Sequence, residues 1–343
     1  MTTTPQIIVL FLSTFFLVGL LTPIMRRIAL RINFVDEPNA NHKSHIQAIP
    51  YLGGVAIILG MLLVTFSALL SQDNLNGNLW AAVSLFAPAL LLGIVGLIDD
   101  KKALDPLPRF IAQTVAGVFT AFLMIATDTV GNPSGNSILD AVITTFWVVG
   151  ISNSINFFDN LDGGAAGSIA ATALGLTLIT QSNGQFLLSA SAITVLAAML
   201  GFLIWNKSPA RIYMGDAGSL FLGTVIAVLT IRLNPTVDGK IFSFSIPVLL
   251  LAVPILDTSV AVISRLRRRV SIFQGGRDHL SHRLIRRGFS KKHAAFTLWS
   301  LSLIFAAIAV TLAQDRTISP YLVTLALAFW IFLLILFLKV SDS

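Results

Sequence analysis

Long apolar runs without a charged residue recur along the whole 343-residue chain. A helix of about 20 apolar residues crosses the roughly 30 Å hydrocarbon core of a bilayer. Hydrophobic residues make up 55% of the chain, charged residues make up 11%, and the mean hydropathy is +0.84, a balance unlike that of water-soluble domains. The runs are continuous rather than alternating, which excludes a transmembrane β-barrel. The sequence therefore predicts an all-α polytopic membrane protein with one transmembrane domain over residues 1–343.

We expect eleven transmembrane helices from these runs. They lie approximately at 5–25, 50–71, 79–98, 108–127, 137–155, 164–181, 185–205, 216–232, 242–264, 294–313 and 320–339. The first run has no basic segment before it and no small-residue cleavage site after it, so we expect a retained helix rather than a signal peptide. The sixth and eighth runs are short and contain glycine, and merging or splitting either one would invert the topology that follows.

Lysine and arginine residues gather on one side of this layout. If the odd-numbered helices exit on that side, it holds all 23 of them except Arg232, Lys240 and Arg316. Basic loops stay in the cytoplasm, so we expect an outer N-terminus and a cytoplasmic C-terminus in the cell (inner) membrane. The cytoplasmic loops then lie near 26–49, 99–107, 156–163, 206–215 and 265–293. These loops also carry the clustered acids, which predicts a site that faces the cytoplasm.

Two adjacent carboxylates, Asp99 and Asp100, end the third apolar run and precede Lys101 and Lys102. One interpretation is a solvated helix end. Adjacent carboxylates repel each other, however, and such a pair suits a hard divalent cation or the proton of a substrate. Arg109, at the start of the next run, could bring a fixed positive charge to the same place.

A second cluster follows the fifth run, in "SNSINFFDNLDGGAAG" at 152–167. Its amides repeat at helical spacing and share one face with two neighbouring acids; these residues are Asn153, Asn156, Asn160, Asp159 and Asp162. Such amides could mediate helix packing. Their density favours a polar cavity, because polar groups are costly inside a membrane.

Two further clusters complete the cytoplasmic side. Asp216, in "RIYMGDAGSLFLG", could cap a helix or bind a metal ion, and Asn206 lies shortly before it. The stretch 265–293 could attract anionic lipid through its charge. Arginine forks and titratable histidines also suit phosphate recognition, which makes the following residues candidate contacts: Arg277, His279, His282 and Arg283.

In this order, "GLIDDKK", "NFFDNLDGGAAG", "RIYMGDAGSLFLG" and "DHLSHRL" resemble the polyprenyl-phosphate N-acetylhexosamine-1-phosphate transferases. The stretch "DEPNANHKSHIQAIPYLGG" is similar to the first cytoplasmic loop of that family, so the resemblance covers residues 36 to about 289. It implies one transmembrane catalytic domain that moves an N-acetylhexosamine 1-phosphate from a UDP-sugar to a polyprenyl phosphate and releases UMP. It also implies a need for Mg²⁺, with Mn²⁺ as a possible substitute, and a homodimer; no nucleic acid partner is expected.

The resemblance assigns roles to individual residues. It implies catalytic roles for Asp99, Asp100, Asp159, Asp162 and His279, and metal binding by Asp216 with Asp99 and Asp100. It implies substrate contacts from Lys43, His45, Arg109, Asn153, Asn156, Asn206, Arg277, His282 and Arg283. The chain departs from the family where "HLSH" replaces adjacent histidines and where "NHKSH" replaces Arg-Lys-x-His.

The loop "GGRDHLSHRLIRRGFS" resembles the branch of the family that uses UDP-GlcNAc, and it offers no apolar groove for a peptide arm. We therefore expect transfer of GlcNAc 1-phosphate to undecaprenyl phosphate for a cell-envelope glycan, with UDP-GalNAc as an open epimer. The alternative within the family is a phospho-N-acetylmuramoyl-pentapeptide transferase. A secondary transporter would need mid-membrane acids and paired halves, but the chain has no internal repeat and only Asp257 lies deep in a run. A lipid-binding scaffold would leave the acidic motifs without a role.

Overall fold

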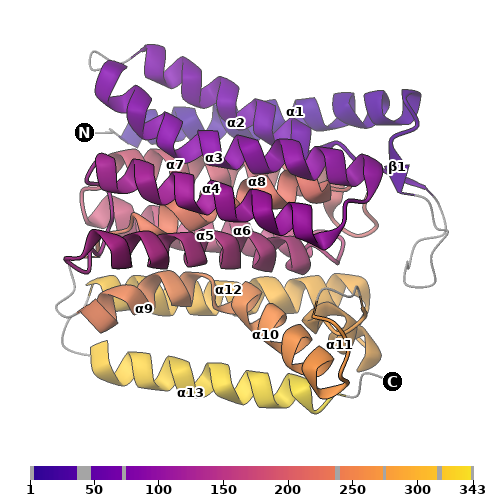
Figure 1. Cartoon of the computed structure of the whole chain (residues 1–343). Helices are drawn as coiled ribbons and strands as arrows, with labels where there is room; N and C mark the ends of the chain where they lie inside the picture. The colour runs from indigo at the N-terminus through magenta and orange to yellow at the C-terminus, as the bar shows by residue number, and fades with distance from the viewer. Residues whose placement is uncertain are drawn as a thin grey trace.

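The chain folds into a bundle of helices that lie roughly side by side (Figure 1). A computed structural model describes residues 4–36, 48–71, 75–235, 240–272, 276–314 and 319–340. The helices are α1 (Thr4–Arg31), α2 (Gly53–Leu70), α3 (Leu75–Lys102), α4 (Pro106–Ala126), α5 (Ser137–Phe158), α6 (Gly164–Ser182), α7 (Phe186–Asn206), α8 (Gly215–Ile231), α9 (Lys240–Leu250), α10 (Ala252–Arg267), α11 (Leu280–Arg286), α12 (Lys291–Gln314) and α13 (Ser319–Leu338). Two short strands, β1 (Val35–Asp36) and β2 (Ile49–Pro50), pair antiparallel at one end of the bundle.

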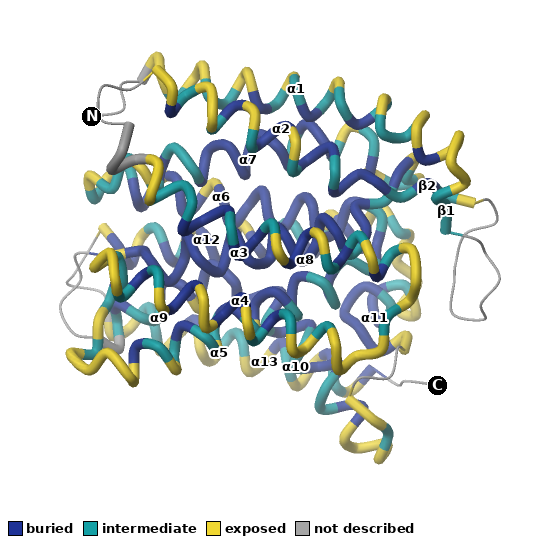
Figure 2. Tube along the Cα trace, turned by 45° about the horizontal axis from the view of Figure 1, so that its top comes forward, coloured by how far each residue is buried: buried dark blue, intermediate teal, exposed yellow. Residues whose placement is uncertain are grey.

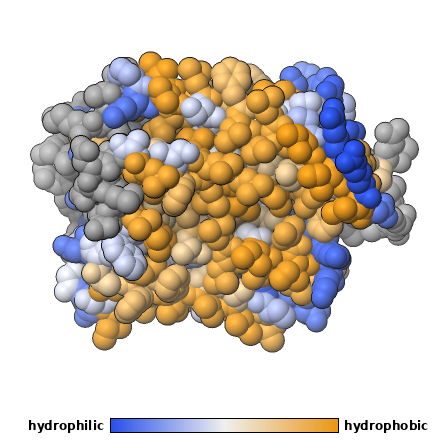
Figure 3. Space-filling view, turned by 90° about the horizontal axis from the view of Figure 1, so that it is seen from above, coloured by the Kyte–Doolittle hydropathy of each residue, from blue (hydrophilic) through white to orange (hydrophobic). Residues whose placement is uncertain are grey.

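Nine of the described helices are long and apolar enough to cross a membrane, or ten if the bent pair α9 and α10 forms one span. The helix α8 is also apolar but has only 17 residues. The space-filling view shows apolar side chains over the middle of the visible face and polar ones toward its two ends (Figure 3). The all-α polytopic membrane fold is thus confirmed, whereas the count of eleven spans and their orientation stay predictions.

The centre of the bundle is α8, which packs against α3, α5 and α2. Every residue of α8 except Asp216 is buried. At the periphery, only 17% of the apolar window of α1 and of α13 is buried (Figure 2). A helix with apolar side chains on all sides belongs in the interior of such a bundle. Asp216, the one residue of α8 that is not buried, therefore marks the place where this central helix approaches solvent.

The predicted ninth span is wrong as one continuous helix. It is broken at Leu251 into α9 and α10, whose axes differ by 75°. Pro254 has no N–H to donate to the carbonyl of Leu250, which is the bond that a continuous helix would make there. The hydroxyl of Thr172 donates to that carbonyl instead, at 2.7 Å. The break thus follows from a proline that the uniform hydropathy of the run concealed.

Several helix ends extend beyond the predicted ones. The first helix continues to Arg31 and the third to Lys102, so only residues 103–105 separate α3 from α4. The basic stretch 265–293 contains the short helix α11, which hydropathy alone does not reveal. The predicted contacts Lys43 and His45 lie outside the described residues. The remaining predicted site residues lie at one end of the bundle, beside β1 and α11 (Figure 1).

Candidate active site

The carboxylate of Asp100 holds the first turn of α8. The amide N–H of Asp216 donates to Asp100 Oδ1 at 2.8 Å, and that of Ala217 donates to Oδ2 at 3.1 Å. The first N–H groups of a helix have no partner within the helix, and the helix dipole favours negative charge there. Gly215 precedes them with φ +71°, and a Cβ at this residue would lie 2.6 Å from Asp100 Oδ2. The last turn of α3 and the first turn of α8 are therefore locked together.

The neighbouring Asp99 binds Arg109 rather than the helix. Arg109 Nη1 donates to Asp99 Oδ2 at 2.7 Å and lies 3.5 Å from Asp216 Oδ2, while the Leu104 N–H donates to Asp99 Oδ1 at 2.6 Å. The Asp99 side chain is only 4% exposed, whereas those of Arg109 and Asp216 are 31% and 32% exposed. The guanidinium thus bridges two carboxylates, of which only Asp216 faces solvent to a substantial extent.

Two of the predicted amides of α5 have different partners. Asn156 Nδ2 donates to Asp216 Oδ1 and to Ser219 Oγ, both at 2.9 Å, so this amide belongs to the acidic cluster. Asn153 instead pairs with Gln113 of α4 through bonds of 2.6 and 3.2 Å. The helix-packing interpretation therefore describes Asn153, and Gln113 is a partner that the sequence motifs did not include.

The loop from Asp159 to Gly163 lies beside this cluster and is tied to α7 and the segment after it. The Gly163 N–H donates to Asn206 Oδ1 at 3.0 Å, and the Ala210 N–H donates to Asp162 Oδ2 at 3.2 Å. The pKa of the Asp159 carboxyl is raised to about 7. The largest cause is desolvation by the surrounding protein, and the negative charges of Asp100 and Asp162 add to it. The loop therefore places a carboxyl with a pKa near neutral pH within reach of the charge of Asp100 on α3.

Three residues near the aspartates were not singled out as site residues by the sequence reasoning. Asp36 ends β1 and accepts a hydrogen bond from the phenol of Tyr51, whose ring centroid lies 6.2 Å from that of Tyr213. Burial raises the pKa of the Tyr213 phenol, and the charges of Asp162, Asp36 and Asp159 also raise it. Asp36 begins the motif "DEPNANHKSHIQAIPYLGG" and Tyr51 lies three residues before its end, so this motif was the sequence feature that could have identified them.

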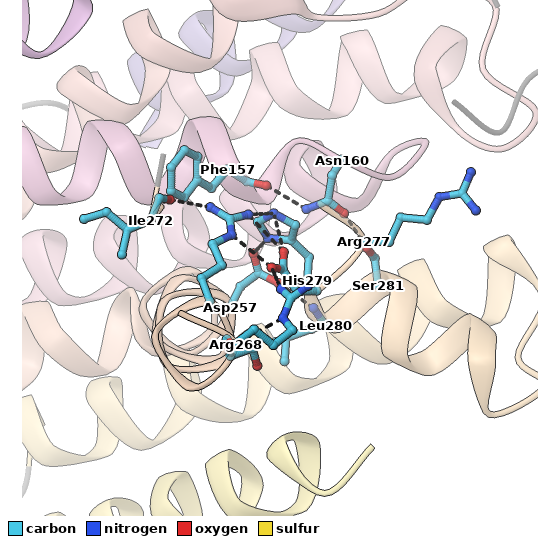
Figure 4. Close-up of polar contacts among 12 residues, drawn as sticks. Phe157, Asn160, Asp257, Arg268, Ile272, Arg277, His279, Leu280 and Ser281 are labelled. Atoms are coloured by element: carbon cyan, nitrogen blue, oxygen red, sulfur yellow. Dashed lines mark hydrogen bonds and ion pairs between the residues drawn. The ribbon is translucent and has the colours of Figure 1, made fainter. Parts of the chain in front are cut away.

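A second polar cluster joins α10 to α11 (Figure 4). His279 Nδ1 lies 2.7 Å from Asp257 Oδ2, and the Leu280 N–H donates to Asp257 Oδ1 at 2.7 Å. Arg265 donates to both oxygens of Asp278 at 2.9 Å. Burial by itself would raise the pKa of Asp278, but the hydrogen bonds and charge of Arg265 hold it below its usual value. Asp257, the acid that lies deep in the ninth apolar run, thus orients the imidazole of His279.

The short helix α11 contacts the end of α5. The hydroxyl of Ser281 donates to Asn160 Oδ1. This serine, which lies between the two histidines of "HLSH", therefore links α11 to the loop that carries Asp159 and Asp162. Burial lowers the pKa of His282 to about 4, with further lowering by the charge of His279. His282 is therefore neutral at physiological pH and can serve a phosphate as a neutral donor.

Two arginines that were predicted to contact the substrate, Arg277 and Arg283, do not lie at the acidic cluster. Arg283 is 1% exposed and donates to the carbonyls of Asp278, Phe337 and Val340 and to Ser264 Oγ. It thereby fixes the end of α13 to α11. Arg277 is exposed, and its side chain points away from the His279 cluster (Figure 4). The structure brings neither guanidinium to the aspartates.

Of the residues predicted to bind a metal ion, Asp216 is the one whose surroundings suit that role. Among the residues that the structure describes, no group of three or more His, Asp or Glu side chains could hold a metal ion. The oxygens of Asp99 and Asp100 accept protein hydrogen bonds, whereas the Asp216 side chain is 32% exposed and its Oδ2 lies 3.5 Å from Arg109 Nη1. Carboxylate and amide oxygens are the donors that Mg²⁺ prefers. The carboxylate of Asp216 and the amide oxygen of Asn156 are donors of the kind that fits such an ion, which would take its further ligands from water and substrate.

These features define a polytopic membrane protein with an acidic site at one end of its helices. A sequence model described as "Glycosyl transferase family 4" matches residues 80–234. A probable undecaprenyl-phosphate N-acetylglucosaminyl 1-phosphate transferase of Bacillus subtilis is 32% identical over 98% of this chain and 91% of its own length. The chain therefore belongs to glycosyl transferase family 4, and the family resemblance predicted from its motifs is confirmed.

Other relatives differ in how much of the chain they match. A decaprenyl-phosphate N-acetylglucosaminephosphotransferase of Mycobacterium leprae is 32% identical over 88% of this chain and 82% of its own length. A phospho-N-acetylmuramoyl-pentapeptide-transferase of Streptococcus agalactiae is also 32% identical, but over 54% of this chain and 60% of its own length. Identity is thus equal, whereas coverage favours the relatives named for N-acetylglucosamine.

Proposed function

We propose that this protein transfers N-acetylglucosamine 1-phosphate from UDP-GlcNAc to undecaprenyl phosphate or another polyprenyl phosphate and releases UMP. The observation that carries the reaction class is the group of Asp99, Asp100, Arg109 and Asp216 around the first turn of α8. The choice of N-acetylglucosamine rests on the relative that matches 98% of the chain. The product would serve a cell-envelope glycan.

The chemistry is a phosphoryl transfer between anions. An oxygen of the lipid phosphate attacks the phosphorus that carries the sugar, the bond between the two donor phosphates breaks, and its bridging oxygen leaves with UMP. One phosphoanhydride bond is lost and one is formed, so the reaction should be close to thermoneutral and reversible. The protein therefore has to manage negative charge, and preorganised positive charge is the largest contribution to be expected.

Two elements supply such charge at this site. The first turn of α8 has partly positive N–H groups, although Asp100 already accepts from two of them. The Arg109 side chain is 31% exposed, and its contacts with Asp99 and Asp216 are made through Nη1, so the other N–H groups of the guanidinium are the ones we assign to a phosphate oxygen. We therefore assign Arg109 to a substrate phosphate and Asp99 to the orientation of Arg109.

A divalent cation completes the charge balance in this proposal. We assign Asp216 as its protein ligand and Asn156 as the residue that orients the Asp216 carboxylate. Mg²⁺, or Mn²⁺ in its place, would neutralise charge on the donor diphosphate when bound. Asp99 and Asp100 act on the same centre through Arg109 and through the start of α8, which refines their predicted role as direct ligands.

Asp159 is the carboxyl best suited to proton transfer. Its pKa of about 7 lies near the working pH, which is where a general base is most effective. Asp159 accepts any proton that remains on the lipid phosphate. Asp162 accepts a hydrogen bond from the Ala210 N–H and so holds the segment between α7 and α8. His279, oriented by Asp257, and neutral His282 lie on the donor side, where they contact the sugar or its phosphate.

We place this site at the cytoplasmic face of the inner membrane, because the basic residues gather at the same end of the helices. Reporter fusions after Ser343 should read cytoplasmic, and fusions within 233–241 should read external. A C-terminus outside the cell would overturn this orientation. The homodimer remains a prediction that a mass measurement on detergent-solubilised protein would test.

The decisive experiment compares donors on purified protein. With undecaprenyl phosphate and Mg²⁺, labelled UDP-GlcNAc should yield labelled lipid and UMP, whereas UDP-MurNAc-pentapeptide should yield neither. Preferential use of the muramoyl donor would overturn the choice of sugar and favour the peptidoglycan branch. Consumption of UDP-GalNAc alone would change the epimer. Uptake of an unmodified solute into vesicles, without any UMP, would favour the transporter reading instead.

A further inference from the structure

A tryptophan of α12 holds the loop that carries Asp159 and Asp162. Trp299 Nε1 donates to the carbonyl of Gly163 at 3.0 Å. On the other side of the same residue, the Gly163 N–H donates to Asn206 Oδ1 at 3.0 Å. Side chains from α12 and α7 thus bind both the backbone N–H and the carbonyl of Gly163, the last residue before α6.

The shape of the contact leaves little freedom to the loop. Gly163 has φ +71°, and a Cβ there would lie 3.0 Å from Leu203 Cδ1. At Gly167, one turn into α6, a Cβ would lie 2.2 Å from Trp299 Nε1. The indole therefore lies against the first turn of α6, in a space that only glycine leaves open.

The position of Trp299 in the chain is unexpected for a residue with this role. It lies outside residues 80–234, which the family model matches, and outside each motif that pointed to the site. Between Asp159 and Gly163 the loop has one turn, in which the Gly164 N–H donates to the Leu161 carbonyl at 2.8 Å, and it is otherwise irregular. A short loop of this kind depends on bonds to its surroundings to keep its carboxylates in place.

We infer that Trp299 is a positioning residue of the active site, which sets the place of Asp159 and Asp162 through the carbonyl of Gly163. The inference rests on the proposed function for its effect on turnover, but not for its effect on the loop. A displacement of about 1 Å at a reacting centre can cost up to about a hundredfold in rate. Loss of the indole N–H should therefore reduce turnover well beyond its effect on folding.

The test uses Trp299→Phe, which keeps an aromatic ring and removes the N–H. The matched control is Trp147→Phe, because Trp147 Nε1 donates to Thr230 Oγ1 at 3.1 Å and is also partly buried. Thr230 lies 14 residues after Asp216 on α8, or about 21 Å along the helix. Both variants lose one hydrogen bond of an indole, but only one of these bonds reaches the acidic loop.

Three quantities are measured on full-length protein in detergent: kcat and KM with UDP-GlcNAc and undecaprenyl phosphate, the melting temperature, and hydrogen exchange of the backbone amides of 159–164. For Trp299→Phe we expect kcat to fall about tenfold or more with KM changed less, and exchange of the loop to speed up about tenfold. For Trp147→Phe we expect a similar small loss of melting temperature, with kcat and loop exchange as in the wild type.

Each outcome decides something. Unchanged loop exchange in Trp299→Phe overturns the inference, whatever happens to turnover. Equal losses of kcat in both variants also overturn it, because the effect would then follow stability alone. If the wild type shows no transferase activity but loop exchange rises only in Trp299→Phe, the positioning role stands and the proposed function fails.

Discussion

The acidic cluster at the start of α8 and the histidine cluster between α10 and α11 differ in how they are exposed. In the first, Arg109 and Asp216 are each about one-third exposed and point at each other across 3.5 Å. In the second, the side chains of Arg265 and Asp278 are 3% and 2% exposed and are fully engaged with protein groups. The first cluster retains charge for a substrate, whereas the second uses its charge to fix the shape of the protein.

The largest expected effect is in the acidic cluster. Asp216→Asn keeps the size of the side chain and removes its charge, so turnover should fall at least about a hundredfold, which corresponds to about 3 kcal/mol of transition-state stabilisation. The melting temperature should change little, because Asp216 is the one residue of α8 that is not buried. The check is the initial rate of UMP release over a range of Mg²⁺ concentrations. Wild-type turnover at limiting Mg²⁺ would remove Asp216 from the metal site.

The next effect is on stability and belongs to the second cluster. Arg283→Met leaves the carbonyls of Phe337 and Val340 without their donor, which should cost about 3 kcal/mol of unfolding free energy. Arg277→Met is the matched control, because that guanidinium is exposed six residues earlier in the chain. Denaturant midpoints in detergent give the comparison. An equal midpoint for Arg283→Met and the wild type would show that the buried arginine does not hold α13.

A smaller effect separates charge from geometry at Arg109. Arg109→Lys keeps the positive charge and one nitrogen that can contact Asp99 and Asp216, as Nη1 does, but it loses the other guanidinium N–H donors that we assign to a substrate phosphate, so kcat/KM should fall about tenfold. Arg287→Lys, an exposed arginine at the end of α11, serves as the control and should leave kcat/KM as it is. Steady-state kinetics with both substrates provide the measurement. Full activity in Arg109→Lys would mean that charge alone is sufficient there.

The smallest expected effect is the pH dependence due to Asp159. Its pKa of about 7 exceeds the value near 4 of the unfolded chain, so between about pH 4 and 7 the folded state retains a proton that the unfolded state has lost. Stability therefore decreases as the pH rises through that window, while turnover increases a few-fold as the carboxylate forms. Melting temperatures in metal-free buffer should decline less steeply with pH for Asp159→Asn. Parallel slopes for the two proteins would contradict the raised pKa.

Much of the acidic site could be predicted from the sequence. Asp100 and Asp216 are 116 residues apart, yet motif order and membrane side placed both at one end of the helices. The bond from the α8 backbone to Asp100 could not be predicted, because it depends on how α3 and α8 pack. The same holds for Asn153, whose spacing suggested the substrate side but whose amide meets Gln113 across a helix interface.

The second cluster was much less predictable. Basic and histidine residues in 265–293 suggested phosphate contacts, but composition cannot tell an exposed guanidinium from one that is folded into the protein. Arg283 is buried because the end of α13, more than fifty residues later, supplies carbonyl acceptors. The hydrogen bonds from Thr172 to the Leu250 carbonyl and from Trp299 to the Gly163 carbonyl likewise depend on helices that are distant in sequence. Local pattern identifies the chemistry, whereas tertiary packing decides which groups are free to perform it.

The division between the two clusters can be tested in one measurement, the rate of label transfer from UDP-GlcNAc to undecaprenyl phosphate per folded molecule. Wild type, Asp216→Asn and Arg283→Met would be assayed side by side, with the folded fraction of each determined in the same detergent. We predict a loss of at least about a hundredfold for Asp216→Asn and a change of less than about threefold for Arg283→Met. The reverse order, with Arg283→Met the slower enzyme, would contradict the placement of the reaction at the start of α8.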